Sequence, residues 1–351
     1  MKEARLDYLN MGLMLISLIA AFILPFEVFL FSYAILGPLH YLTEISWLHD
    51  RKYFSPKKFD YIPLVILSAG ILLGSAVVIG EDAYNFLLSI GIGEFFSTYA
   101  TDMIFIAFGV ALIFILTPNP WYRVVAVVGV VIAAIVFHNM TDRTQPWNGI
   151  YWSIFALYLP TLIHVYIFTM LFMIFGALKR QSITGHASVV FMILCAVSCF
   201  VLIPDTSYYE ISEWGQSSYE ETFKTLSQLT LYHFSSFSAI EIATMNLFDE
   251  PASVMLGRFI AFAYTYHYLN WFSKTKVIGW HRVPKSRFIA VIVLWLLSIA
   301  LYLYDYELGF RWLFLLSFAH VLLEFPLNHQ SILGIGREIK LRVTGEKYRA
   351  T

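Results

Sequence analysis

The sequence predicts an all-α protein, a polytopic bundle of transmembrane helices. Of its 351 residues, 59% are hydrophobic and only 13% are charged, and the mean hydropathy is +0.68. Ordinary soluble domains are far less apolar. Apolar runs of about 17 to 25 residues recur along the chain, and a helix of about 20 residues crosses a hydrocarbon core. These runs are continuous rather than alternating, which argues against a transmembrane β-barrel.

About ten segments are long and apolar enough to be expected as spans. They are residues 9–25, 28–48, 61–80, 102–117, 121–138, 150–177, 187–204, 254–272, 288–304 and 311–333. We find no hydrophilic linker long enough to separate two domains. Residues 1–351 are therefore expected to form a single integral membrane domain.

The distribution of charge predicts the orientation. Lys and Arg gather at the N-terminus, at 51–58, at 179–180, at 274–287 and in the C-terminal tail, whereas acidic residues gather in the segments between them. Basic loops tend to be cytoplasmic, so both termini are expected on that side. If the polar segment 228–248 crossed the membrane, the basic loop at 274–287 would be forced outside. We therefore expect segment 228–248 to be interfacial or re-entrant, and a candidate wall of a site.

A repeated spacing, H-x3-E-x4-H, is the sharpest motif. It occurs as His40, Glu44 and His49 in the second predicted span and as His320, Glu324 and His329 in the last. Residues four apart share a helix face, so each copy directs an imidazole and a carboxylate the same way, as metal sites in helix bundles require. The last histidine of each copy lies nine residues from the first, about half a turn away, and joins the site only if the helix ends or bends.

Further histidines accompany this repeat. His267 and His281 flank the predicted cytoplasmic end of the span at 254–272, and His233 lies in the polar segment. His164 lies in the middle of a span and could be a ligand, a proton carrier or an interhelical hydrogen-bond partner. Buried imidazoles and carboxylates suit iron, zinc or manganese. The alternative is that each His and Glu pair is a structural contact between helices or part of a proton path.

The order of these motifs resembles that of the membrane-bound Brp/Blh carotene dioxygenases. This all-helical family cleaves beta-carotene to retinal with a histidine-ligated non-haem iron. The corresponding elements here are Pro38-Leu39-His40 with Glu44, then His233-Phe234, then His267, then His320 with Glu324. In this chain Leu39 separates the proline from the histidine, and Trp271 stands where the family has a second histidine. His281, His164 or His329 could replace that ligand.

The prediction is a metal-dependent integral membrane oxidoreductase. The resemblance implies a non-haem iron oxygenase that acts on a carotenoid, an isoprenoid or another lipid from the bilayer, in a bacterial or archaeal cytoplasmic membrane. The expected metal ligands are His40, His267 and His320, with His233, His281 and His329 in reserve. Glu44 and Glu324 would either bind the metal or orient the imidazoles.

Two alternatives use the same residues. One is a proton- or ion-coupled membrane transporter, in which the intramembrane His and Glu side chains bind the ion or the substrate. The other is a membrane scaffold whose polar residues serve packing. A net charge of −1 and the lack of a basic domain or a low-complexity tail argue against a nucleic-acid partner.

Overall fold

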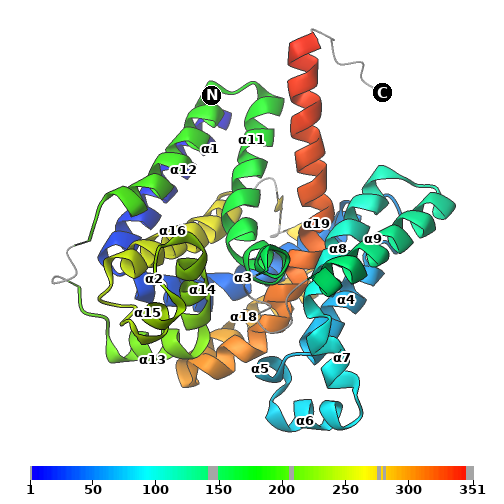
Figure 1. Ribbon diagram of the computed structural model, residues 1–351. Coiled ribbons are helices and arrows are strands. Elements are labelled where there is room, and N and C mark those ends of the chain that lie inside the picture. The colour runs from blue at the N-terminus through cyan, green and yellow to red at the C-terminus, as the bar shows by residue number, and fades with distance from the viewer. Residues whose placement is uncertain (1, 141–148, 205–208, 275–277, 280–281, 345–351) are drawn as a thin grey trace. The chain divides into compact units, whose positions relative to one another are not determined.

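The computed structural model describes residues 2–140, 149–204, 209–274, 278–279 and 282–344 (Figure 1). These residues form helices joined by short connections, and no strand occurs among them. Seven helices are long and apolar enough to cross a membrane, or eight if one bent pair counts as a span. The chain is thus all-helical, and its helices indicate an integral membrane protein.

The seven candidate spans coincide with seven of the predicted apolar segments. They are Ala4–Ile23, Pro25–Asp50, Pro120–Met140, Ile150–Arg180, Ile183–Val201, Lys285–Tyr304 and Tyr306–Thr344. In the labels of Figure 1 these are α1 (Lys2–Ile23), the run α2–η1–α3 (Pro25–Phe31, Ser32–Leu36, Gly37–Asp50), α9 (Pro120–Met140), the run α10–η4–α11 (Ile150–Trp152, Ser153–Phe168, Thr169–Arg180), α12 (Ile183–Val201), α18 (Lys285–Tyr304) and α19 (Tyr306–Thr344).

The other three predicted spans take different forms. Segment 61–80 becomes α4 (Ile62–Leu73) and the short α5 (Ala76–Ile79), and α4 is too short to cross a bilayer alone. Segment 102–117 becomes α8 (Ala100–Leu116), which follows α7 (Ile92–Thr98) across a bend of 62°. Segment 254–272 becomes α16 (Pro251–Ser273), which is long enough but more polar than the candidate spans. The count of ten spans and the cytoplasmic termini stay predictions.

Segment 228–248, which we expected not to cross, consists of short helices. α14 (Lys224–Phe234) and α15 (Ala239–Thr244) follow α13 (Glu213–Thr222). None of the three is long enough to span the hydrocarbon core, because 11 residues of α-helix rise only about 16 Å. Their place relative to the bilayer stays a prediction.

Internal contacts divide the chain into two compact units. The first comprises Met1–His40 and Val165–Phe310, and the second comprises Tyr41–His164 and Arg311–Thr351. The three divisions fall inside continuous helical runs, after His40 in α3, after His164 in η4 and after Phe310 in α19. The expectation of a single membrane domain stays a prediction.

The first unit is built around α16, which packs against α1, α2, η1, α12 and α14. Most of the side chains of α16 are buried. A helix surrounded by protein can be less apolar than a helix that faces lipid. α16 and α2 lie close together at Gly257, where an added Cβ would be 3.0 Å from the Phe26 ring of α2. A larger residue at this position would require that ring to shift.

The second unit contains α8, which packs against α4 and α9, and a hairpin-like group of short helices, α5 to α7, in which α6 is Glu81–Ser89. A buried ion pair joins two of its segments. Arg123, in the first turn of α9, donates to both carboxylate oxygens of Asp60 at 2.8 and 3.2 Å. The same guanidinium donates to the carbonyls of Thr117 and Phe114, so its charge and its donors are both satisfied.

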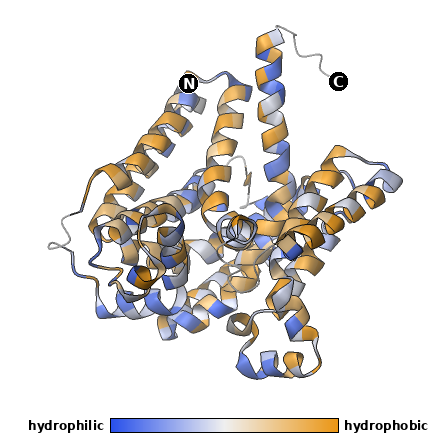
Figure 2. Cartoon of the chain, viewed as in Figure 1, coloured by the Kyte–Doolittle hydropathy of each residue, from blue (hydrophilic) through white to orange (hydrophobic). Residues whose placement is uncertain are grey.

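Hydrophobic residues predominate along many of the helices (Figure 2). In the candidate spans of α9 and α18, only 11% of the residues of the most apolar window are buried within the protein. Exposed Val, Ile and Leu side chains follow both helices along their length. Apolar surface on this scale is typical of helices that face lipid.

Candidate metal centre

The segment that carries His40 begins in a π-helix, η1. The Gly37 N–H donates to the carbonyl of Ser32, five residues back rather than four. Pro38 follows directly, and proline has no N–H with which to continue the α-helical ladder. In the same turn, the Ile35 carbonyl accepts a hydrogen bond of 2.8 Å from Trp295 Nε1. π-Helical turns are rare and frequently lie at functional sites, and this one immediately precedes a buried histidine.

A second and longer π-helix carries His164. η4 covers Ser153–Phe168 and contains Pro160, four residues before the histidine. Proline again removes one backbone donor from the helix, which favours a wider hydrogen-bonding register. Both π-helices thus occur beside a proline and beside a buried histidine.

In the first unit, His40 and His267 face each other. Their Nε2 atoms lie 3.1 Å apart, and the rings meet edge to face. The other ring nitrogen of His267, Nδ1, lies 2.7 Å from the hydroxyl of Thr169. Tyr268 and Trp271 contact the His40 ring, with centroid distances of 5.2 and 5.4 Å. The pair is therefore enclosed by aromatic rings.

In the second unit, His164 and His320 form an equivalent pair. Their Nε2 atoms lie 3.0 Å apart. Nδ1 of His164 lies 3.2 Å from a carboxylate oxygen of Glu324. This contact meets the distance of an ion pair but not the geometry of a hydrogen bond. Tyr41 stacks on the His320 ring at 4.4 Å.

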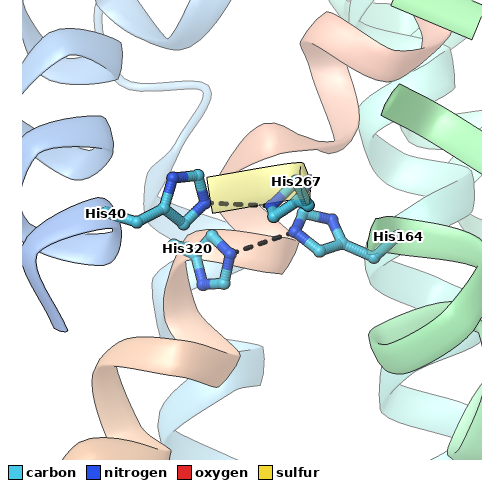
Figure 3. A group of neighbouring side chains, drawn as sticks. All are labelled: His40, His164, His267 and His320. Carbon is cyan, nitrogen blue, oxygen red and sulfur yellow. Dashed lines mark hydrogen bonds between the residues drawn. The ribbon is translucent and has the colours of Figure 1, made fainter. Parts of the chain in front are cut away.

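These histidines form a buried group that could hold a metal ion (Figure 3). His40, His164, His267 and His320 each offer one ring nitrogen, and the four nitrogens lie within 4.8 Å of one another. Two imidazole nitrogens on one zinc-like ion, about 2.05 Å from it, would be about 3.3 Å apart in a tetrahedral site and about 2.9 Å apart in an octahedral one. The distances of 3.1 and 3.0 Å within the two pairs fit adjacent positions of either geometry.

The charge of this group also suits a cation. Four neutral imidazoles contribute lone pairs but no charge, and the Glu324 carboxylate beside His164 supplies negative charge nearby. Imidazole is a good ligand for iron, zinc, copper and nickel. The residues present therefore fit a transition-metal ion bound through nitrogen.

The structure brings together three of the expected ligands, His40, His267 and His320, and adds His164. The sequence showed His164 as an isolated histidine in an apolar span, and that signal alone left a ligand, a proton carrier and a structural contact open. Pro160 is the sequence feature that could have drawn attention to His164, because this proline lies inside the π-helix that carries the histidine. A carboxylate oxygen of Glu324 lies 3.2 Å from Nδ1 of His164, and Glu44 is buried one turn after His40, so the roles expected for these two residues stay predictions.

The reserve ligands lie elsewhere. His233 is half-buried in α14 and is not part of the four-histidine group. His329 is buried, but its Nε2 lies 2.9 Å from the carbonyl of Phe108, and its ring packs on the Phe108 ring. His281 lies outside the described residues. The last histidine of each repeat thus stays out of the group, and His49 is exposed beside Asp50.

Comparisons with protein-family models, with curated proteins and with solved structures found no match to this chain. The chemistry of the histidine group therefore carries the functional argument.

Proposed function

We propose that this protein is a metal-dependent integral membrane oxidoreductase, a non-haem iron oxygenase whose metal is held by His40, His164, His267 and His320. The observation that supports this proposal most directly is the buried group of four ring nitrogens. No carboxylate or thiolate belongs to that group among the described residues, so a bound divalent ion would keep its positive charge. When bound, iron would supply the activation of O2.

The surroundings of the histidines favour an apolar substrate. Tyr41 stacks on His320, and Tyr268 and Trp271 contact His40. Such rings exclude water and offer flat surfaces to a polyene or an isoprenoid chain. The apolar outer faces of the helices support a location in a bilayer, from which a lipid substrate would enter. The proposed substrate is a carotenoid, an isoprenoid or another lipid, and the proposed location is a bacterial or archaeal cytoplasmic membrane.

The residues of the chain would have separate roles in this reaction. The four histidines hold the ion, and Glu324 keeps the His164 ring oriented through Nδ1. The aromatic side chains keep bulk water away from the reacting bond. Glu44, buried on α3, is proposed as a further polar group of the site.

Elemental analysis of the purified protein tests this proposal. Wild type is compared with His40→Ala, His320→Ala and the matched control His329→Ala. The control removes a buried histidine that shares α19 with His320 but does not belong to the four-histidine group. We expect near-stoichiometric iron in wild type and in the control, and its loss in the other two variants. Oxygen consumption with beta-carotene or a shorter isoprenoid, followed by product analysis, then tests the reaction.

Two results would count against the proposal. If wild type, purified without chelators and reconstituted with Fe²⁺, retains no metal, the oxygenase is excluded. The proton- or ion-coupled transporter would then be the better reading, and uptake into proteoliposomes would test it. If the control loses iron as the other variants do, the assigned set of ligands is wrong.

A further inference from the structure

We propose that Thr169 and Glu324 are a pair of positioning residues that hold the imidazoles of His267 and His164 by their Nδ1 atoms and direct the Nε2 atoms toward one ion. This inference rests on the proposed metal site and deepens it. Neither residue is a ligand in this proposal. Each acts through the histidine that it contacts.

Thr169 contacts His267 inside the protein. Its hydroxyl oxygen lies 2.7 Å from Nδ1 of His267, and both side chains are buried. Nε2 of the same ring faces His40 at 3.1 Å. If Nδ1 donates its proton to the threonine hydroxyl, Nε2 is left with its lone pair, which is the form that binds a metal. The contact thus fixes both the tautomer and the orientation of the ring.

Glu324 has the same place relative to His164. Its carboxylate oxygen lies 3.2 Å from Nδ1, while Nε2 of His164 faces His320 at 3.0 Å. Glu324 is four residues beyond His320 on α19. This helix therefore supplies one proposed ligand, His320, and also the residue that would orient the facing ligand, His164. The two contacts differ, because the Thr169 hydroxyl makes a hydrogen bond to its histidine, whereas the Glu324 carboxyl lies at ion-pair distance without hydrogen-bond geometry.

The π-helix explains how one helical run serves both contacts. His164 lies in η4, and Thr169 is the first residue after it. On an ideal α-helix, five residues advance about 500°, which would turn Thr169 about 140° away from His164. In a π-helix, residues five apart are joined by the backbone hydrogen bonds and lie about one turn apart. Consistent with this, the side chains of His164 and Thr169 are both 2% exposed.

Conservative and disruptive variants separate positioning from packing. Thr169→Val keeps the shape of the side chain but removes the hydroxyl, and Thr169→Ser restores the hydroxyl. Glu324→Leu removes the acceptor, whereas Glu324→Gln keeps an oxygen acceptor and removes the charge. Thr230→Val is the matched control, because Thr230 is also buried and its hydroxyl bonds only to the Leu226 carbonyl of its own helix.

The experiment measures the affinity of the metal-free full chain in detergent for Fe²⁺, by anaerobic chelator competition. Residues that orient a ligand typically change metal affinity by about 10- to 100-fold when they are mutated. We expect a loss of this size in Thr169→Val and Glu324→Leu. The Fe²⁺ affinities of Thr169→Ser and Thr230→Val should stay close to that of wild type. The affinity of Glu324→Gln should lie between those of wild type and Glu324→Leu. The visible absorption of the Co²⁺-substituted protein at saturation should change in Thr169→Val but not in Thr230→Val.

The outcomes separate this inference from the proposal on which it rests. If wild type binds neither Fe²⁺ nor Co²⁺, the proposed metal site is wrong and the positioning roles are overturned with it. If wild type binds metal and Thr169→Val and Glu324→Leu bind it equally well with unchanged Co²⁺ spectra, the metal site stands and the positioning roles are wrong. A loss in Thr169→Val that Thr169→Ser does not restore would mean that packing, not the hydroxyl, is responsible, and would also overturn the inference.

Discussion

Nε2 of His40 lies 3.1 Å from Nε2 of His267, a distance at which the two nitrogens cannot both carry a proton. Without a cation, one ring must donate to the other. With a cation, both lone pairs can face the same ion. The pair therefore gains a favourable arrangement when metal binds, and metal binding should stabilise the fold.

We expect metal to raise the thermal unfolding midpoint of the protein. A ligand that binds only the folded state, at a free concentration of 100 times its dissociation constant, raises the free energy of unfolding by about 2.7 kcal/mol. Chelation should lower the midpoint of wild type, and addition of Fe²⁺ should restore it. His267→Ala should show no such dependence, whereas His233→Ala, outside the group, should respond like wild type. An equal response of His267→Ala would remove this histidine from the site.

Pro160 is expected to maintain the π-helix that carries His164. In Pro160→Ala, the new N–H can donate to the carbonyl four residues back, which favours the α-helical register and turns Thr169 away from His164. We expect a loss of Fe²⁺ affinity of about tenfold or more. Pro251→Ala is the control, because Pro251 occupies the first turn of α16, where the missing N–H has no helical partner. Unchanged affinity in Pro160→Ala would show that the proline does not set the register.

The spans could be predicted from the sequence because a bilayer selects long apolar runs. The expected segment 288–304 and the observed α18, Lys285–Tyr304, differ by a few residues at most. Hydropathy could not distinguish lipid neighbours from protein neighbours, however. For that reason 254–272 was expected as a span like the others, although α16 proves to be surrounded by the helices of its unit.

The site could be predicted only in part. His40 and His320 were expected because each has a carboxylate four residues on, a spacing that any α-helix turns into a shared face. Thr169 could not be found in this way, since α-helical geometry places it on a different face from His164. The π-helical register of Ser153–Phe168 has no signature in composition. Pro38 and Pro160 were its only traces in the sequence.

The buried pair of Asp60 and Arg123 should be important for the stability of the second unit. Arg123→Met leaves the Asp60 carboxylate buried without its counter-charge, and breaking such pairs costs about 3–5 kcal/mol. The double variant Asp60→Leu with Arg123→Met should recover most of that loss, because neither charge remains. Lys57→Met, at an exposed side chain nearby, is the control. Thermal unfolding in detergent measures the stability of Arg123→Met, of the double variant and of Lys57→Met. If the double variant is no more stable than Arg123→Met, the bonds from the guanidinium to the carbonyls are more important than the ion pair.

Tyr151 should stabilise the first turn of α8 through its hydrogen bond to Asp102. The buried Asp102 carboxylate accepts hydrogen bonds of 2.9 Å from the Tyr151 hydroxyl and from Nδ1 of His138. Tyr151→Phe removes one donor and leaves the ring in place, and hydrogen bonds to charged groups contribute about 1.5–3 kcal/mol. Thermal unfolding should show a loss of that size. Tyr304→Phe, at a side chain that is 83% exposed, should have almost no effect.

The start of α15 should loosen at acidic pH. Glu241 and Ser238 form a reciprocal cap, in which the Ser238 backbone N–H and hydroxyl both donate to the Glu241 carboxylate. These bonds, the backbone bond foremost, lower the pKa of Glu241 below its usual value of 4.5. Because the folded pKa is the lower one, the stabilisation is complete above the unfolded pKa and is lost as the pH falls through the folded pKa. Amide hydrogen exchange of residues 239–244, corrected for the intrinsic pH dependence, should therefore show less protection as the pH falls through the lowered pKa of Glu241. Glu241→Gln should show weaker protection at neutral pH and little further loss on acidification, and equal pH dependence in both proteins would exclude Glu241 as the cause.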